Sequence, residues 1–132
     1  MISIKTHQNK LSALCAASTA AMGSGAAMTW LLGGNFEQIS HCINNMIGDV
    51  TGIICDGAGS ACSMKVSTSS SAAVRAALMA INDLHIPESQ GIVSDDVDQT
   101  IANLGRIATR GMLETDIEII KIMRAKQRSS CN

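Results

Sequence analysis

The chain has 132 residues and a mass of 13.8 kDa, with 46% hydrophobic and 16% charged residues. This length suits one domain with its own core, and the composition excludes a disordered chain. The formal charge is −1, and the aromatic residues are limited to Trp30 and Phe36. Both features argue against nucleic-acid binding, which needs positive charge and stacking side chains.

Residues 11–33 form an uncharged run that is long enough to span a bilayer. Because the run follows Lys5 and Lys10, it also resembles an export signal. The run is dominated by Ala, Ser, Thr and Gly rather than by large apolar residues. We therefore expect no membrane role, and a helix over 11–32 that packs closely inside a bundle. Gly33 and Gly34 end it, since C-terminal capping needs positive φ.

A second helix is expected to begin at Asn35, whose side chain forms a capping box with Gln38. Its apolar residues recur at helical steps as far as Ile54. Gly48 and Gly52 interrupt this face and indicate close packing against another helix.

Three further helices are expected. A turn over 55–61 precedes a third helix to about Leu84, and residues 85–93 form a loop. Ser94 is expected to cap a fourth helix, and Thr115 with Glu118 a fifth. We expect one all-α domain over 1–132, a compact bundle of about five helices, with a flexible tail over 125–132.

Five cysteines are an odd number in a chain too long and apolar for a disulfide-stapled scaffold. We expect a reduced, cytoplasmic protein, in which a free cysteine usually acts as a small buried hydrophobic residue. Cys42 fits that role, because it lies within the apolar pattern of the second helix. Cys55 and Cys62 lie seven apart on a glycine-containing turn, a spacing wider than zinc pairs use. A soft-metal or cluster site, a disulfide and chance all remain open on spacing alone, with Cys15 as the third candidate ligand.

Three stretches carry a resemblance to a known family: "LSALCAASTAAMGSGAAMTWLLGGN", "NMIGDVTGIICDGAGSACSMKVSTS" and "GIVSDDVDQTIANLGRIATRGMLETDIEIIKIM". Together they resemble the L-cysteine desulfidase family, whose members are related to the α chain of bacterial iron–sulfur L-serine dehydratases. The resemblance spans roughly residues 7–124 and concerns the C-terminal third of those longer proteins.

The resemblance implies a helical domain that holds a 4Fe–4S cluster on Cys15, Cys55 and Cys62, with one iron open and no pyridoxal phosphate. An open iron acts as a Lewis acid on an amino-acid substrate, L-cysteine or L-serine. The implied reaction is β-elimination to pyruvate and ammonia, with sulfide released from cysteine. The alternative is a non-catalytic remnant or helical interaction domain without a cluster.

The N-terminal catalytic part of the family is absent from this chain, so we expect no turnover by the chain alone. A separate N-terminal chain could complete the site, and the chain could also form a homo-oligomer. Asp56, Lys65, Ser67 and Thr68 are candidates for substrate binding, although Asp56 could equally cap the turn and the hydroxyls could cap the third helix. Gly59 stands where many relatives carry a basic residue. Cys131 could reach the open iron as a fourth ligand. His7, His41 and His85 show no metal spacing, and we expect a solvated or capping role for His41.

Overall fold

The computed structural model describes residues 12–129, with side chains as far as residue 127. This part of the chain is all-helical, as the sequence predicted, and contains no strand. The helices are α2 (Ala16–Leu31), α3 (Phe36–Val50), α4 (Ala61–Ile81), α5 (Val97–Arg106) and α6 (Leu113–Ser129), with a π-helical turn η1 (Ile107–Gly111) between the last two.

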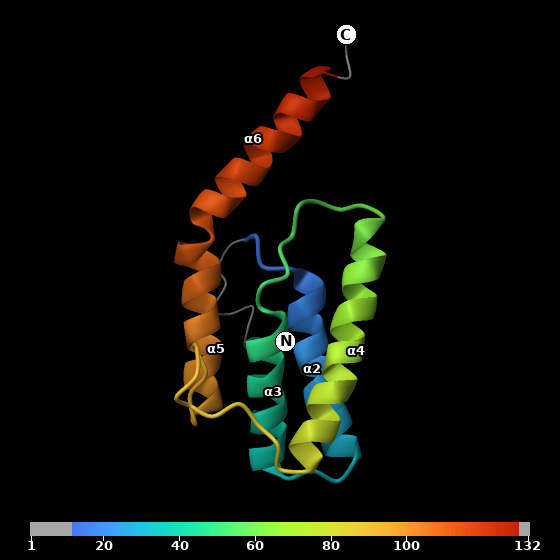
Figure 1. The fold of residues 1–132 in the computed structure, drawn as a ribbon, viewed down its shortest axis with the longest axis vertical. Coiled ribbons are helices and arrows are strands. Elements are labelled where there is room, and N and C mark those ends of the chain that lie inside the picture. The colour runs from blue at the N-terminus through green and yellow to red at the C-terminus, as the bar shows by residue number, and fades with distance from the viewer. Residues whose placement is uncertain (1–11, 130–132) are drawn as a thin grey trace.

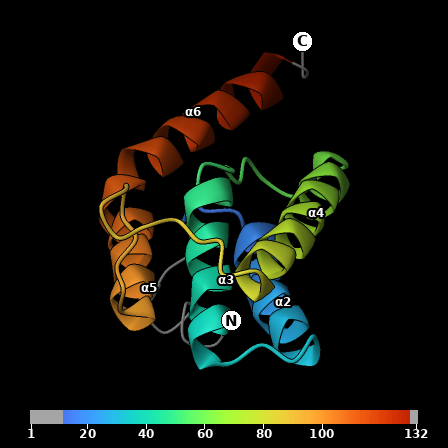
Figure 2. The same cartoon turned by 60° about the horizontal axis from the view of Figure 1, so that its bottom comes forward.

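Helices α2, α3 and α4 lie side by side as a three-helix core, with α5 beside α3 (Figures 1 and 2). Small side chains allow this close approach: Ala72, Ala73, Ala76, Ala77 and Ala80 line the buried face of α4. Met22, Met46, Ile47 and Leu104 fill the space between the helices and are fully buried. Cys42 is also fully buried in this core, as expected.

Helix α2 confirms the prediction that the uncharged run forms a helix of small residues packed inside the bundle. Its buried face includes Ser18, Thr19 and Thr29, and the Thr29 hydroxyl donates to the Gly25 carbonyl at 2.9 Å. The hydroxyl oxygens of Ser18 and Ser69 lie 3.4 Å apart between α2 and α4. In residues 12–129 no helix is long and apolar enough to cross a membrane.

The sequence located several helix ends correctly. Gly33 follows α2 with φ +87°, and the Asn35–Gln38 capping box at α3 has both of its hydrogen bonds, at 2.9 and 3.1 Å. Gly48 does permit close packing, but its contact is Ile86 from the segment after α4 rather than a residue of a helix.

Other ends differ from the prediction. Helix α2 begins at Ala16 and α3 ends at Val50, because residues 13–15 and 53–55 are extended and pair with each other. Helix α4 ends at Ile81, with Asp83 soon after it at φ +57°.

Two predicted caps are wrong. Asp96, not Ser94, caps α5, since its carboxylate accepts from the Asp98 amide at 3.0 Å. Thr115 lies inside α6, because the Asp116 amide already donates to Met112 and the helix begins at Leu113. Glu118 instead pairs with Lys121 at 3.0 Å. Helix α6 continues to Ser129 and so includes residues 125–129 of the expected tail, whose flexibility stays a prediction.

Candidate functional site

Cys15 and Cys55 are brought together by a short antiparallel pairing of two extended segments. The Cys15 amide donates to the Ile53 carbonyl at 3.1 Å, and the Cys55 amide donates to the Ala13 carbonyl at 2.6 Å. Leu14 and Ile54 form the bridge between them. Because successive side chains alternate between faces, Cys15 and Cys55 lie diagonally on the same face of the pair.

Cys62 reaches the same end of the bundle from the first turn of α4. Its amide donates to the Gly59 carbonyl at 3.0 Å, and its thiol donates to the Gly57 carbonyl at 3.8 Å. Cys15 is the residue before α2 and is buried, whereas Cys55 and Cys62 are half-buried. The turn that carries Cys55 therefore lies between the starts of two helices.

The starts of α2 and α4 lie at one end of the bundle, next to this turn (Figure 1). Neither helix has an acidic residue in its first turn. The N-terminal end of a helix carries partial positive charge, which suits an anionic group. Both helix starts thus favour an anionic group beside the cysteines.

Lys65 adds a full positive charge beside the cysteines. Its ammonium donates to the Ile54 carbonyl at 2.8 Å and forms an ion pair with Asp56 at 2.5 Å. The hydrogen bond that Lys65 donates to Asp56 raises the pKa of Lys65, and negative charge at Asp56, Cys15 and Cys55 raises it further, against an opposing effect of burial. Lys65 therefore holds the turn through Asp56 and the Ile54 carbonyl, and the charges of Cys15 and Cys55 act on it more weakly.

Ser67 and Thr68 do not join this cluster of groups. They are exposed in the second turn of α4, and the helix begins at Ala61, so neither supplies a cap. Their predicted contact with substrate stays a prediction, as do those of Asp56 and Lys65. Cys131 and His7 lie outside the described residues.

Helix α6 reaches the cysteine turn, which the sequence did not indicate. Gly57 has φ +103°, and a Cβ atom built there would lie 3.1 Å from the Met123 methyl group. The charge of Lys126 contributes to lowering the pKa of Asp56, behind the larger effect of Lys65. In the sequence, Gly57 could indicate only a tight turn at this position, because glycine adopts positive φ readily.

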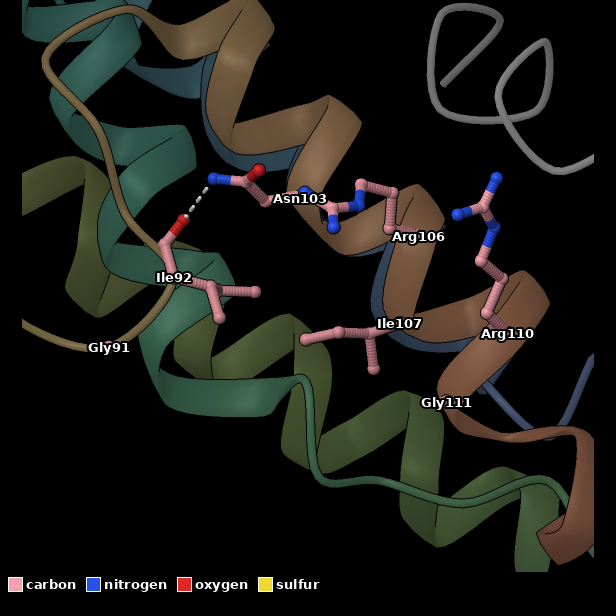
Figure 3. A pocket seen from close by; sticks show the side chains of 7 residues that line it. All are labelled: Gly91, Ile92, Asn103, Arg106, Ile107, Arg110 and Gly111. Atoms are coloured by element: carbon pink, nitrogen blue, oxygen red, sulfur yellow. Dashed lines mark hydrogen bonds between the residues drawn. The ribbon is translucent and has the colours of Figure 1, made fainter.

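A separate hollow of about 420 Å³ lies beside α5 and η1, where Ile92 faces Ile107 (Figure 3). The Asn103 amide donates to the Ile92 carbonyl at 3.0 Å and so holds the preceding loop against α5. Arg106 and Arg110 line the same hollow, which includes none of the cysteines. It is distinct from the cysteine site.

The model of the serine dehydratase alpha chain family matches residues 1–121. This chain belongs to the serine dehydratase alpha chain family. All three cysteines of the site lie within the matched residues.

Individual relatives of this family member carry less specific names. The UPF0597 protein of Aeromonas salmonicida (strain A449) is 84% identical over 127 residues, which cover 96% of this chain and 29% of that protein. The UPF0597 protein of Shewanella pealeana is 58% identical, over 95% of this chain and 29% of that protein. The UPF0597 protein YhaM of Escherichia coli O1:K1 / APEC is 54% identical, over 96% and 29%. No solved structure matches. The chain thus spans 29% of the length of these curated relatives.

The residues at the site suit an iron–sulfur cluster in their chemistry. Three thiols from separated segments are the donor set that such clusters use, and two helix starts and Lys65 offset negative charge there. Within residues 12–129, however, no three Cys, His, Asp or Glu side chains are already gathered closely enough to hold a metal ion.

Proposed function

We propose that this chain is the cluster-binding part of an iron–sulfur lyase that acts on L-cysteine in preference to L-serine. The observation that supports this most strongly is the arrangement of Cys15, Cys55 and Cys62 around the starts of α2 and α4, in a chain of the serine dehydratase alpha chain family. The reaction is β-elimination: the α-proton leaves together with HS⁻ from cysteine or with hydroxide from serine, which departs as water, and the enamine formed is hydrolysed to pyruvate and ammonia.

Cys15, Cys55 and Cys62 would hold the cluster, which would supply a Lewis-acidic iron with an open position. The chain's own residues shape the surroundings. Lys65 holds the turn in place through its ion pair with Asp56. Its positive charge near Cys15 and Cys55 favours a bound carboxylate or a departing anion there. The two helix starts add to the same positive field.

The base that removes the α-proton belongs, in this proposal, to the part of the family's length that this chain does not cover. We expect the 132-residue chain to bind the cluster and to release neither sulfide nor pyruvate by itself. Activity is expected once a chain corresponding to the remainder of the relatives is added.

Anaerobic reconstitution of the full chain with iron and sulfide tests cluster binding. We expect visible absorbance and an EPR signal after reduction in the wild type. Cys15→Ser, Cys55→Ser and Cys62→Ser should each lose most of this signal. Cys42→Ala is the matched control, because Cys42 is a buried core residue and should leave it unchanged.

A second candidate function has its own support. The chain covers only 29% of the length of its relative in Aeromonas salmonicida, and the described residues contain no group of three possible metal ligands. Both findings are also compatible with a helical interaction domain without a cluster. A wild-type chain that folds fully yet retains no iron after reconstitution and desalting would establish this alternative and refute the cluster proposal.

A further inference from the structure

Helix α6 carries a stripe of apolar side chains that is exposed in this chain. Leu113, Ile117 and Ile120 follow one another at steps of four and three residues, so they lie on one side of the helix. Their exposed fractions are 55%, 38% and 48%. Helix α6 extends past the end of the bundle of α2, α3 and α4 (Figures 1 and 2), and the bundle leaves this stripe uncovered.

A helix of this composition depends on packing for its stability. Most of the stability of a helix in a folded protein comes from burial of its apolar face rather than from the helix propensity of its residues. Four of the 17 residues of α6 are isoleucine, which is β-branched and a weaker helix former than alanine or leucine. An exposed apolar stripe on such a helix indicates a surface that another protein segment covers.

The stripe lies next to the part of α6 that contacts the cysteine turn. Met123 follows Ile120 by three residues, so the two side chains are neighbours on the helix surface. A Cβ atom built on Gly57 would lie 3.1 Å from the Met123 methyl group. At the same end of the bundle, Met64 in the first turn of α4 is 73% exposed. Exposed apolar side chains therefore lie near the cysteine turn on both α6 and α4.

The relatives of this chain contain both α6 and a further length of polypeptide that could cover it. The match to the Aeromonas salmonicida protein spans 127 of the 132 residues, so at most five residues lie outside it and at least twelve of the 17 residues of α6 lie inside it. The match covers 29% of that protein, so 71% of its length lies elsewhere in the same polypeptide. Covalent linkage gives that portion a far higher effective concentration at the stripe than a second molecule has.

We propose that the exposed stripe of α6 is the docking surface for the remaining length of the family's proteins, which presents an apolar face to Leu113, Ile117 and Ile120. Docking there brings that remaining part beside the cysteine turn. The base of the lyase reaction would then lie close to the cysteines, a consequence that rests on the proposed function. The docking itself needs no cluster, because it uses apolar side chains of α6 and no cysteine.

Hydrogen–deuterium exchange, measured without iron, tests this docking surface in two proteins. The first is the 132-residue chain, and the second joins to it the remaining part of the Aeromonas salmonicida relative. We expect the amides of residues 113–123 to exchange at least about tenfold more slowly in the joined protein, because burial of one apolar side chain shifts a local opening equilibrium by about this factor. Ile120→Gln should remove most of this protection.

Ile122→Gln is the matched control. Ile122 is the same residue type on the same helix and is 50% exposed, but two residues along a helix place it on nearly the opposite side from Ile120. This replacement should leave the protection in the joined protein unchanged. Equal effects of the two replacements, or equal exchange of α6 in the two proteins, would overturn the proposal.

Two further measurements separate the alternatives. If sedimentation of the 132-residue chain shows a dimer that Ile120→Gln abolishes and Ile122→Gln retains, the stripe binds a second copy and the proposal is wrong. If the joined protein binds the cluster but leaves α6 unprotected, the docking is refuted and the proposed function stands. If α6 is protected in a joined protein that retains no iron after reconstitution, the docking is supported and the proposed function fails.

Discussion

At the scale of single residues, the cysteine turn depends on a glycine and an ion pair. Gly57 has a backbone conformation that side chains disfavour, and Met123 occupies the space beside it. Lys65 and Asp56 then connect the turn to α4. Each of these features can be removed without changing a cysteine, so each makes a separate prediction.

Gly57→Ala should destabilise the chain by about 1–3 kcal/mol, because alanine is strained at this φ and its methyl group meets Met123. The free energy of unfolding from urea denaturation measures the effect. Gly59→Ala is the matched control, since Gly59 lacks a positive φ and has open space at its Cβ position. Equal losses in the two variants would show that neither the strain nor the Met123 contact matters.

Lys65→Met should raise the pKa of Asp56 toward the ordinary value of an aspartate. The hydrogen bond from Lys65 is the largest cause of the lowered pKa in the fold. Because the folded pKa lies below the unfolded one, the ion pair stabilises the fold above the unfolded pKa, and this contribution is lost as pH falls through the folded pKa. Carboxyl ¹³C titration by NMR measures the change. Arg75→Met, which breaks the Arg75–Asp49 pair, should leave the pKa of Asp56 unmoved.

At the scale of elements, the helices begin with different amounts of local support. The Asn35–Gln38 box satisfies two backbone groups at the start of α3. Ser60 precedes α4 but makes no side-chain capping bond. The start of α4 therefore relies on packing and on the Lys65 contacts, whereas α3 has a cap of its own.

Asn35→Ala should cost about 1 kcal/mol of stability, the usual effect of losing a helix cap. Ser60→Ala should change stability by no more than about 0.5 kcal/mol, since no capping bond is lost. Urea denaturation of both variants checks the difference. A loss for Ser60→Ala as large as that for Asn35→Ala would contradict the assignment of the caps.

At the scale of the whole molecule, the proposed ligands come from three places: the start of α2, the turn and the start of α4. A cluster held by Cys15, Cys55 and Cys62 would join the two parallel helices through the turn. Anything that binds only the folded state stabilises it by mass action. The loaded chain should therefore be more stable than the unloaded chain.

Removing iron with a chelator should lower the Tm of the reconstituted chain by several degrees, since a shift of about 1 kcal/mol changes the Tm of a domain this size by roughly 4 °C. Cys62→Ser should show no such change, because it lacks a ligand. Calorimetry before and after chelation measures the difference. If the chelator leaves the Tm of the wild type unchanged, the cluster does not link the two helices structurally.

The sequence by itself determined the helical class, the glycine stop after α2, the capping box of α3 and the burial of Cys42. These depend on contacts within a few residues or on apolar periodicity. The relation to the serine dehydratase alpha chain family was also predicted correctly, because the motifs around Cys15, Cys55 and Cys62 are distinctive, whereas the assignment to L-cysteine desulfidases stays a prediction.

Only the tertiary structure decided the remaining points. The pairing of residues 13–15 with 53–55 shortened two helices, because hydrogen bonds between distant segments outweighed local helical periodicity. The contacts of Met123 with Gly57 and of Ile86 with Gly48 join residues far apart in sequence. Such contacts depend on how the helices pack, which no local pattern of side chains records.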